Sequence, residues 1–184
     1  AFLVKFNSLG TRQWSTYYGG TLDDHGYAMV AETSGMVYLA GNAYSSSGIA
    51  SGGYQNTFGG GSHDAFLAKF DTIGVRQWAT YYGGPGNDGA VATALNFTGN
   101  VYLAGTTSST ANFASGGHQN IHGGGGNDAY LVKFTSIISN PPVAMCQNQT
   151  VIADGNCQGT ITALQFDNGS TDPEGDLLAF NASP

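Results

Sequence analysis

The sequence predicts an all-β fold made of repeated four-stranded antiparallel units. Residues 65–128 repeat residues 1–64 without a gap, with 33 of 64 positions identical, and residues 129–134 begin a third copy. The runs within each copy are short, rich in β-branched and aromatic residues, and bounded by Gly, Ser, Asn or Asp. No long segment has the 3.6-residue periodicity of a helix. A fixed period of this kind indicates a repeat architecture.

Each unit contains four strand-like runs, which in the first copy are residues 1–6, 13–18, 27–32 and 36–43. The first run alternates Phe2, Val4 and Phe6 with Leu3 and Lys5, as a strand requires. The second is aromatic and Thr-rich, and the last two are short and apolar. Glycine-containing turns join the first run to the second and the third to the fourth. Four short antiparallel strands per unit predict one β-propeller blade.

The unit exceeds the ~40–50 residues of common propeller repeats because of one long loop. This loop covers residues 44–63 and, in the second copy, residues 108–127. Insertions in repeats gather on one face, so we expect the loops to form a contact surface for a ligand or partner. The candidate contact residues are Tyr54, Phe58, His118 and His122. The two histidines replace the two aromatics at matching positions in a Gly-rich segment, which favours packing over metal binding.

Three recurring motifs resemble the SBBP-type bacterial β-propeller repeat over residues 1 to about 134. They are Asp-Ala-Phe-Leu-Ala-Lys-Phe, Arg-Gln-Trp-x-Thr-Tyr-Tyr-Gly-Gly and Gly-x-Val-Tyr-Leu-Ala-Gly. The resemblance implies that residues 27–32 and 90–95 are innermost strands. It also implies that residues 1–20 supply two outer strands of one blade, residues 27–82 a whole blade, and residues 90–134 three strands of another.

A closed propeller needs roughly four to eight blades, and this chain holds about two and a quarter. Either the chain is a piece of a longer protein, which we favour, or several chains assemble a ring or filament. The sequence starts at Ala1 inside a strand pattern where later copies read Asp-Ala. We therefore expect a processed or fragmentary N-terminus.

The composition excludes some partners. Charged residues are only 9% of the chain, against roughly 25% in typical soluble domains. The net charge of −7 argues against nucleic acid and anionic membrane surfaces, which require clustered cations. No apolar run approaches the roughly 18–20 residues that span a bilayer. An acidic surface is compatible with divalent cations.

The pattern changes after residue 134. Residues 135–142 contain paired prolines and predict a linker. Residues 143–184 resemble the start of an immunoglobulin-like module of the HYR or PKD type, with strand-like runs at 143–153 and 159–166. A complete module has about seven strands in ~100 residues, so we expect only part of one.

Two cysteines, Cys146 and Cys157, flank a predicted hairpin turn in this module. A disulfide across the hairpin would suit a secreted protein, and two free buried thiols are the alternative. A metal site would need further ligands close by, and no Cys-x-x-Cys or matching His pair is present.

A short acidic loop in the same module is the best candidate metal site. Its candidate calcium ligands are Asp167, Asp172, Glu174 and Asp176. Calcium prefers six to eight oxygen ligands, and alternating carboxylates supply several. The loop resembles calcium-associated loops of cadherin-like and PKD-like modules. The alternative is a polar turn in which Asp caps the backbone.

Two further carboxylates, Asp24 and Asp88, precede the predicted inner strands. By the blade analogy they gather at the rim of the ring, where they could hold a cation. A repeated Asp before a strand more often accepts turn N–H bonds. The aromatic clusters around Trp14 and Trp78 could stack on sugars, but in a repeat they more often pack one unit against the next.

The sequence has no nucleophile elbow, Ser-His-Asp order or phosphate loop. We therefore expect a non-enzymatic, extracellular structural or adhesive repeat protein that belongs to a larger surface or secreted assembly and forms filaments by strand complementation. The alternative is a carbohydrate- or protein-binding propeller module, and a third hypothesis is part of a secreted enzyme. Expected partners are other protein chains or surface glycans. The one cofactor candidate is calcium.

Overall fold

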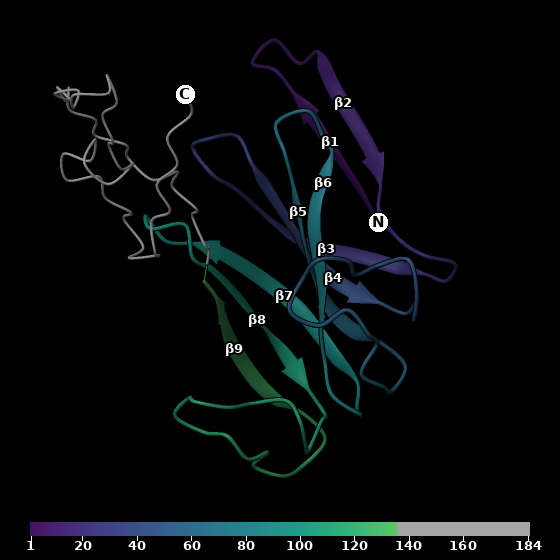
Figure 1. The fold of residues 1–184 in the computed structure, drawn as a ribbon, viewed down its shortest axis with the longest axis vertical. Coiled ribbons are helices and arrows are strands. Elements are labelled where there is room, and N and C mark those ends of the chain that lie inside the picture. Colours follow the sequence, from purple (N-terminus) through teal and green to yellow (C-terminus); the bar gives the residue numbers. More distant parts are fainter. Residues whose placement is uncertain (136–184) are drawn as a thin grey trace, which may run out of the picture. The chain divides into compact units, whose positions relative to one another are not determined.

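The computed structural model describes residues 1–135, which form nine β-strands and no helix (Figure 1). The strands make three antiparallel sheets. The prediction of an all-β fold is therefore confirmed for this part of the chain. Among these residues, no helix is long and apolar enough to cross a membrane. The predicted linker, immunoglobulin-like module, cysteine pair and calcium loop fall on residues 135–184, nearly all outside the described residues.

The central sheet consists of β3 (Asp24–Ala31), β4 (Val37–Ala43), β5 (Asp64–Phe70) and β6 (Arg76–Tyr82), paired in that order. Each strand is antiparallel to the next, so the sheet is a meander. The two middle strands are buried along almost their whole length. Strands covered on both faces need mostly apolar or small residues, and these two have them at every position except Asn42, Asp64 and Lys69.

Two tight turns and one long loop connect these strands. The β3–β4 turn places Gly35 at φ 89°, and the β5–β6 turn places Gly74 at φ 86°. Glycine occupies this left-handed region without the steric cost of a Cβ atom. Asp71 fixes the second turn, because its Oδ1 accepts hydrogen bonds from the N–H groups of Ile73 and Val75 at 3.0 and 2.9 Å. The β4–β5 connection is the predicted long loop, residues 44–63.

The first sheet contains β1 (Phe2–Phe6) and β2 (Arg12–Tyr17), and the third sheet contains β7 (Asp88–Leu95), β8 (Val101–Thr107) and β9 (Asp128–Phe134). Every strand of the third sheet begins 64 residues after its counterpart in the central sheet. The register shift between β3 and β4 recurs at the matching place between β7 and β8. The three sheets do not close into a ring within residues 1–135.

The three sheets pack through two apolar layers. In the layer between the first and central sheets, the Tyr18 ring lies 5.0 Å from Phe66 and 5.7 Å from Phe70. In the layer between the central and third sheets, Leu67 packs with Leu103 and their apolar neighbours. Phe66 and Leu67 are adjacent in β5 and face opposite layers, as the two-residue period of a strand requires.

Candidate functional site

The predicted carboxylate Asp88 is the first residue of β7 and is fully buried. It accepts hydrogen bonds from the Gly84 N–H at 2.8 Å, from the Ser109 hydroxyl at 2.7 Å, and from the Thr107 hydroxyl. These bonds join the end of the Tyr-Tyr-Gly-Gly segment to the start of the long loop. Such bonds are those expected if the repeated Asp before a strand accepts hydrogen bonds from a turn, the alternative to holding a cation.

Asp24 repeats this arrangement at the start of β3. Its Oδ2 accepts a hydrogen bond from the Gly20 N–H at 2.8 Å, and its Oδ1 accepts from the N–H groups of Tyr44 and Ser45 at 3.0 and 3.1 Å. The Ser45 hydroxyl adds a fourth bond at 2.8 Å. Gly20 is required at this corner, because a Cβ atom there would lie 2.2 Å from a backbone oxygen.

A third carboxylate, Asp64, is buried at the start of β5 and differs from the other two. Its Oδ2 accepts a hydrogen bond from the Gly59 N–H at 2.5 Å, whereas its Oδ1 has no partner among the described residues. Burial raises the pKa of Asp64 to about 7, and the negative charge of Asp88 acts in the same direction. This carboxyl is therefore half protonated near neutral pH.

The acidic side chains do not gather into a metal centre within residues 1–135. No group of three or more His, Cys, Asp or Glu side chains lies close enough there to hold an ion. The candidate calcium ligands Asp167, Asp172, Glu174 and Asp176 and the cysteines Cys146 and Cys157 are all outside the described residues.

The two contact candidates of the first long loop lie in different environments. Tyr54 is 79% exposed, so its ring is available to a partner. Phe58 packs edge-to-face on Tyr81 of β6, with ring centroids 5.7 Å apart. This contact holds the loop against the outer strand of the central sheet.

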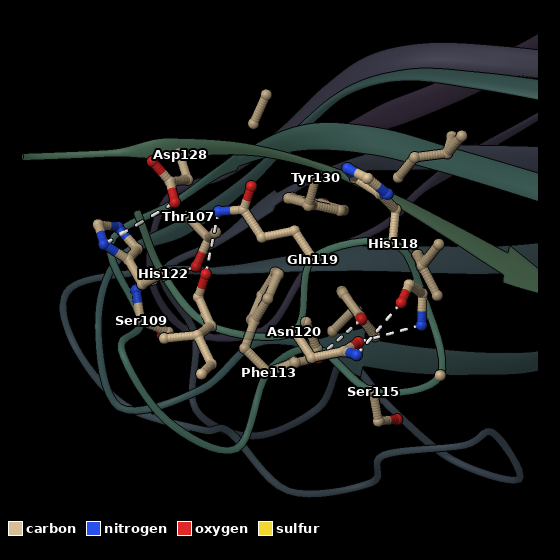
Figure 2. A pocket seen from close by; sticks show the side chains of 18 of the residues that line it. Thr107, Ser109, Phe113, Ser115, His118, Gln119, Asn120, His122, Asp128 and Tyr130 are labelled. Atoms are coloured by element: carbon tan, nitrogen blue, oxygen red, sulfur yellow. Dashed lines mark hydrogen bonds and ion pairs between the residues drawn. The ribbon is translucent and has the colours of Figure 1, made fainter. Parts of the chain in front are cut away.

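The two histidines of the second long loop do not converge. Figure 2 shows His118 and His122 apart from each other, with Gln119 between them. His122 Nδ1 lies 3.9 Å from the Asp128 carboxylate and accepts a hydrogen bond from the Gly124 N–H at 3.1 Å. His118 is exposed. The two imidazoles therefore do not form a shared metal site.

A pocket of about 780 Å³ lies between β9 and the second long loop. Its walls include Tyr82, Phe113 and Tyr130, whose rings contact one another with centroids 4.9 to 5.5 Å apart. Figure 2 shows Phe113, Gln119 and Tyr130 around this space, with β9 along one side. The pocket follows β9 from Asp128 to Lys133.

The conspicuous aromatics of the repeat pack between sheets. On the face of the central sheet that packs against the third sheet, the Trp78 ring meets the Tyr38 ring edge-on at 6.0 Å, and the Tyr82 hydroxyl donates a hydrogen bond to the Phe113 carbonyl at 2.9 Å. In the first repeat, the Trp14 indole N–H donates to the Thr72 carbonyl at 2.9 Å. These contacts are those expected if the aromatic residues pack one unit against the next, the alternative to stacking on sugars.

The chain matches no protein-family model. It is similar to the regulatory protein FlaEY of Caulobacter vibrioides, with 28% identity over 144 residues. The aligned region is 78% of this chain and 15% of that protein, so the chain spans a small part of this relative's length. The similarity is thus to a segment of a much longer protein.

The sequence also places Asp64 and Asp128 directly before a strand, where a repeated Asp could hold a cation or accept turn N–H bonds, but it does not predict that Asp64 is buried. The feature that sequence reasoning misses is the pocket beside β9. Its signal is that no Arg-Gln-Trp segment follows residues 128–134, whereas one follows each of the two earlier copies.

Proposed function

We propose that this chain is a non-enzymatic, extracellular structural or adhesive segment whose sheets act as β-propeller blades within a larger assembly. The recurrence of strand pairing, register shift and face-to-face packing at 64 residues supports this proposal. The low charged fraction and the cysteine pair support placement outside the cell. The buried carboxylates of the repeats serve as hydrogen-bond acceptors for turns, which suits a scaffold.

The observation that carries the proposal is an uncovered apolar face on the first sheet. Phe2 is 70% exposed and Tyr17 is 92% exposed. Their counterparts in the central sheet, Phe66 and Tyr81, are 0% and 1% exposed because the first sheet packs over them. Exposed apolar groups that are buried in an equivalent sheet mark an interaction surface.

The third sheet has an uncovered face at the other end of the stack. Leu131 of β9 is 71% exposed, whereas its counterpart Leu67 in β5 is buried against the third sheet. Burying one such side chain contributes roughly 1.5–3 kcal/mol. The two uncovered faces are different surfaces, so contact between them is head-to-tail, and such contacts build rings or filaments.

Light scattering of the 184-residue chain over a range of concentrations tests this assembly. We expect concentration-dependent association that Phe2→Ser, Tyr17→Ser and Leu131→Ser each weaken. Leu9→Ser is the matched control, since Leu9 is 87% exposed but lies in the turn after β1. A monomer at all concentrations, or equal effects of Leu9→Ser and the face variants, would contradict the proposal.

Surface placement has its own test. Cells that produce the polypeptide containing this chain are treated with a protease that cannot enter them, and the chain is detected with an antibody. We expect its loss from intact cells. Protection in intact cells, with digestion only after lysis, would contradict an extracellular role.

A carbohydrate- or protein-binding module is the second candidate, and the exposure of Tyr54 favours it. Exposed aromatic rings can stack on sugar faces. A glycan array probed with the wild-type chain and with Tyr54→Ala tests this candidate. Binding that Tyr54→Ala abolishes would favour it, and an array without hits would exclude glycans as partners.

A further inference from the structure

The complete central sheet shows how a long loop holds an outer strand. The loop returns along the edge of β6 that faces away from β5, and Ser51 and Ala79 exchange backbone hydrogen bonds of 2.9 and 3.0 Å. The Tyr81 N–H donates to the Gln55 carbonyl at 2.9 Å, and the Gln55 N–H donates to the Thr80 hydroxyl at 2.8 Å. β6 therefore lies between two polypeptide edges, β5 on one side and the loop on the other.

The second long loop has the same local structure, although no outer strand among residues 1–135 lies beside it. In the first loop the Gly53 N–H donates to Asn56 Oδ1 at 3.2 Å, and in the second the Gly117 N–H donates to Asn120 Oδ1 at 3.0 Å. The side chain of Gln119 bonds the carbonyl two residues later, as that of Gln55 does in the first loop. The second loop therefore has its acceptor structure although no strand of the described residues occupies the place of β6.

Within residues 1–135, the facing edge of β9 is also free. β9 pairs with β8 on one side, and on its other side no strand of residues 1–135 pairs with it. The pocket of about 780 Å³ occupies this side, between β9 and residues 109–122. An unpaired strand edge is a ready partner for an added strand.

Backbone carbonyl oxygens that accept hydrogen bonds from side chains define the sequence that the groove fits. In the central sheet the Ile49 carbonyl accepts two hydrogen bonds, one from Tyr18 at 2.8 Å and one from Arg76 at 3.0 Å. The matching carbonyl of Phe113 accepts one, from Tyr82 at 2.9 Å, among the described residues. A carbonyl oxygen has two lone pairs, so the second is open to an arginine.

Two more acceptors that bind β6 in the central sheet have counterparts in the groove beside β9. The Tyr81 hydroxyl donates to the Ser45 carbonyl at 2.7 Å, and Ser109 stands at the matching place in the groove. The Gly83 N–H donates to the side-chain oxygen of Gln55 at 3.2 Å, and Gln119 offers the equivalent oxygen. The groove thus matches arginine, tyrosine and glycine at positions one, six and eight of a strand.

We propose that the groove between β9 and residues 109–122 binds an extended polypeptide strand with the pattern Arg-Gln-Trp-x-Thr-Tyr-Tyr-Gly-Gly. The occupant is a segment of another polypeptide that carries this pattern, and it completes the third sheet as β6 completes the central one. This inference rests on the proposed repeat assembly, but it concerns a strand edge and not the two uncovered faces.

The test is a binding titration with the full chain. The probe is a fluorescein-labelled peptide of residues 76–84, and the control probe is the same residues in reverse order. We expect anisotropy to rise with the first peptide and not with the second, and the exchange of β9 amide hydrogens to slow when the first peptide is present. Equal binding of both peptides, or of neither, would overturn the proposal.

A matched pair of variants locates the site. Gln119→Ala removes one side-chain acceptor in the groove, and we expect roughly 2- to 10-fold weaker peptide binding. Gln55→Ala makes the same change where β6 is already seated, and it is expected to leave peptide affinity unchanged. Equal effects of the two changes would contradict the assigned site.

The face variants separate this inference from the proposed function. Phe2→Ser and Tyr17→Ser lie on the first sheet, so we expect them to weaken association and to leave peptide binding intact. Peptide binding by a chain that never associates would contradict the proposed assembly and support the strand-binding groove. Association without peptide binding would contradict the strand-binding groove and support the proposed assembly.

Discussion

Replacing Asp64 with Asn tests whether the raised pKa of this buried carboxyl makes the stability of the chain depend on pH. Asp64 is 0% exposed, and its Oδ1 has no hydrogen-bond partner among the described residues. Burial raises its pKa from the ordinary value of 3.8 to about 7. The substitution keeps an oxygen to accept from the Gly59 N–H and removes the titrating proton.

The sign of the effect follows from proton binding in the two states. Between pH 3.8 and about 7 the unfolded chain has lost this proton while the folded chain retains it. Ionisation then favours the unfolded state, so the free energy of unfolding falls as pH rises through this interval. At about 1.4 kcal/mol per pH unit, the total loss is about 4 kcal/mol above pH 7.

The assay is urea unfolding followed by tryptophan fluorescence at pH 4.5, 5.5, 6.5 and 7.5. We expect the free energy of unfolding of Asp64→Asn to fall less steeply with pH than that of the wild type, with equal m-values. Asp128→Asn makes the same change at the half-exposed start of β9 and is the matched control. Parallel pH profiles for the wild type and Asp64→Asn would refute the reasoning.

Two further predictions concern the corners of the sheets, and urea unfolding measures both. Asp88→Ala removes the buried acceptor of three hydrogen bonds and should destabilise the chain by about 3 to 5 kcal/mol, whereas Asp23→Ala at an exposed position should have little effect. Gly41→Ala places a Cβ atom 1.8 Å from the His25 carbonyl oxygen and should prevent stable folding, whereas Gly126→Ala meets no atom within 4 Å and should be tolerated. A stable Gly41→Ala chain would contradict the close approach of β3 and β4.

Much of the strand order could be read from the repeat. The alternation of apolar residues in each run and the glycines of the turns correctly located all nine strands of residues 1–135. Several strand ends differ from the expected ones by one or two residues, and the largest difference is at β3 (Asp24–Ala31), which begins three residues before the run expected at residues 27–32. Its first three residues, Asp-His-Gly, have a turn-like composition, but they pair with residues 41–43 of β4 next to a register shift. Tertiary pairing thus overrides local propensity.

The candidate site was harder to predict because burial depends on the neighbouring sheet. Asp64 and Asp128 occupy the same place in the repeat, yet one is fully buried and the other half exposed. The Ser- and Gly-rich loop of residues 44–63 has no strand pattern, so its return along β6 through Ser51 and Gln55 could not be read from its composition. Similar local sequences therefore give different exposure and different hydrogen bonding.

We expect further sheets to cover both uncovered faces of the stack in the natural assembly. An electron cryomicroscopy structure of the particle formed by the polypeptide that contains this chain would test this. We expect a ring or filament of four-stranded sheets in which Phe2, Tyr17 and Leu131 are buried and an outer strand lies beside β9. A particle in which these three side chains remain in solvent, with the β9 edge free, would contradict it.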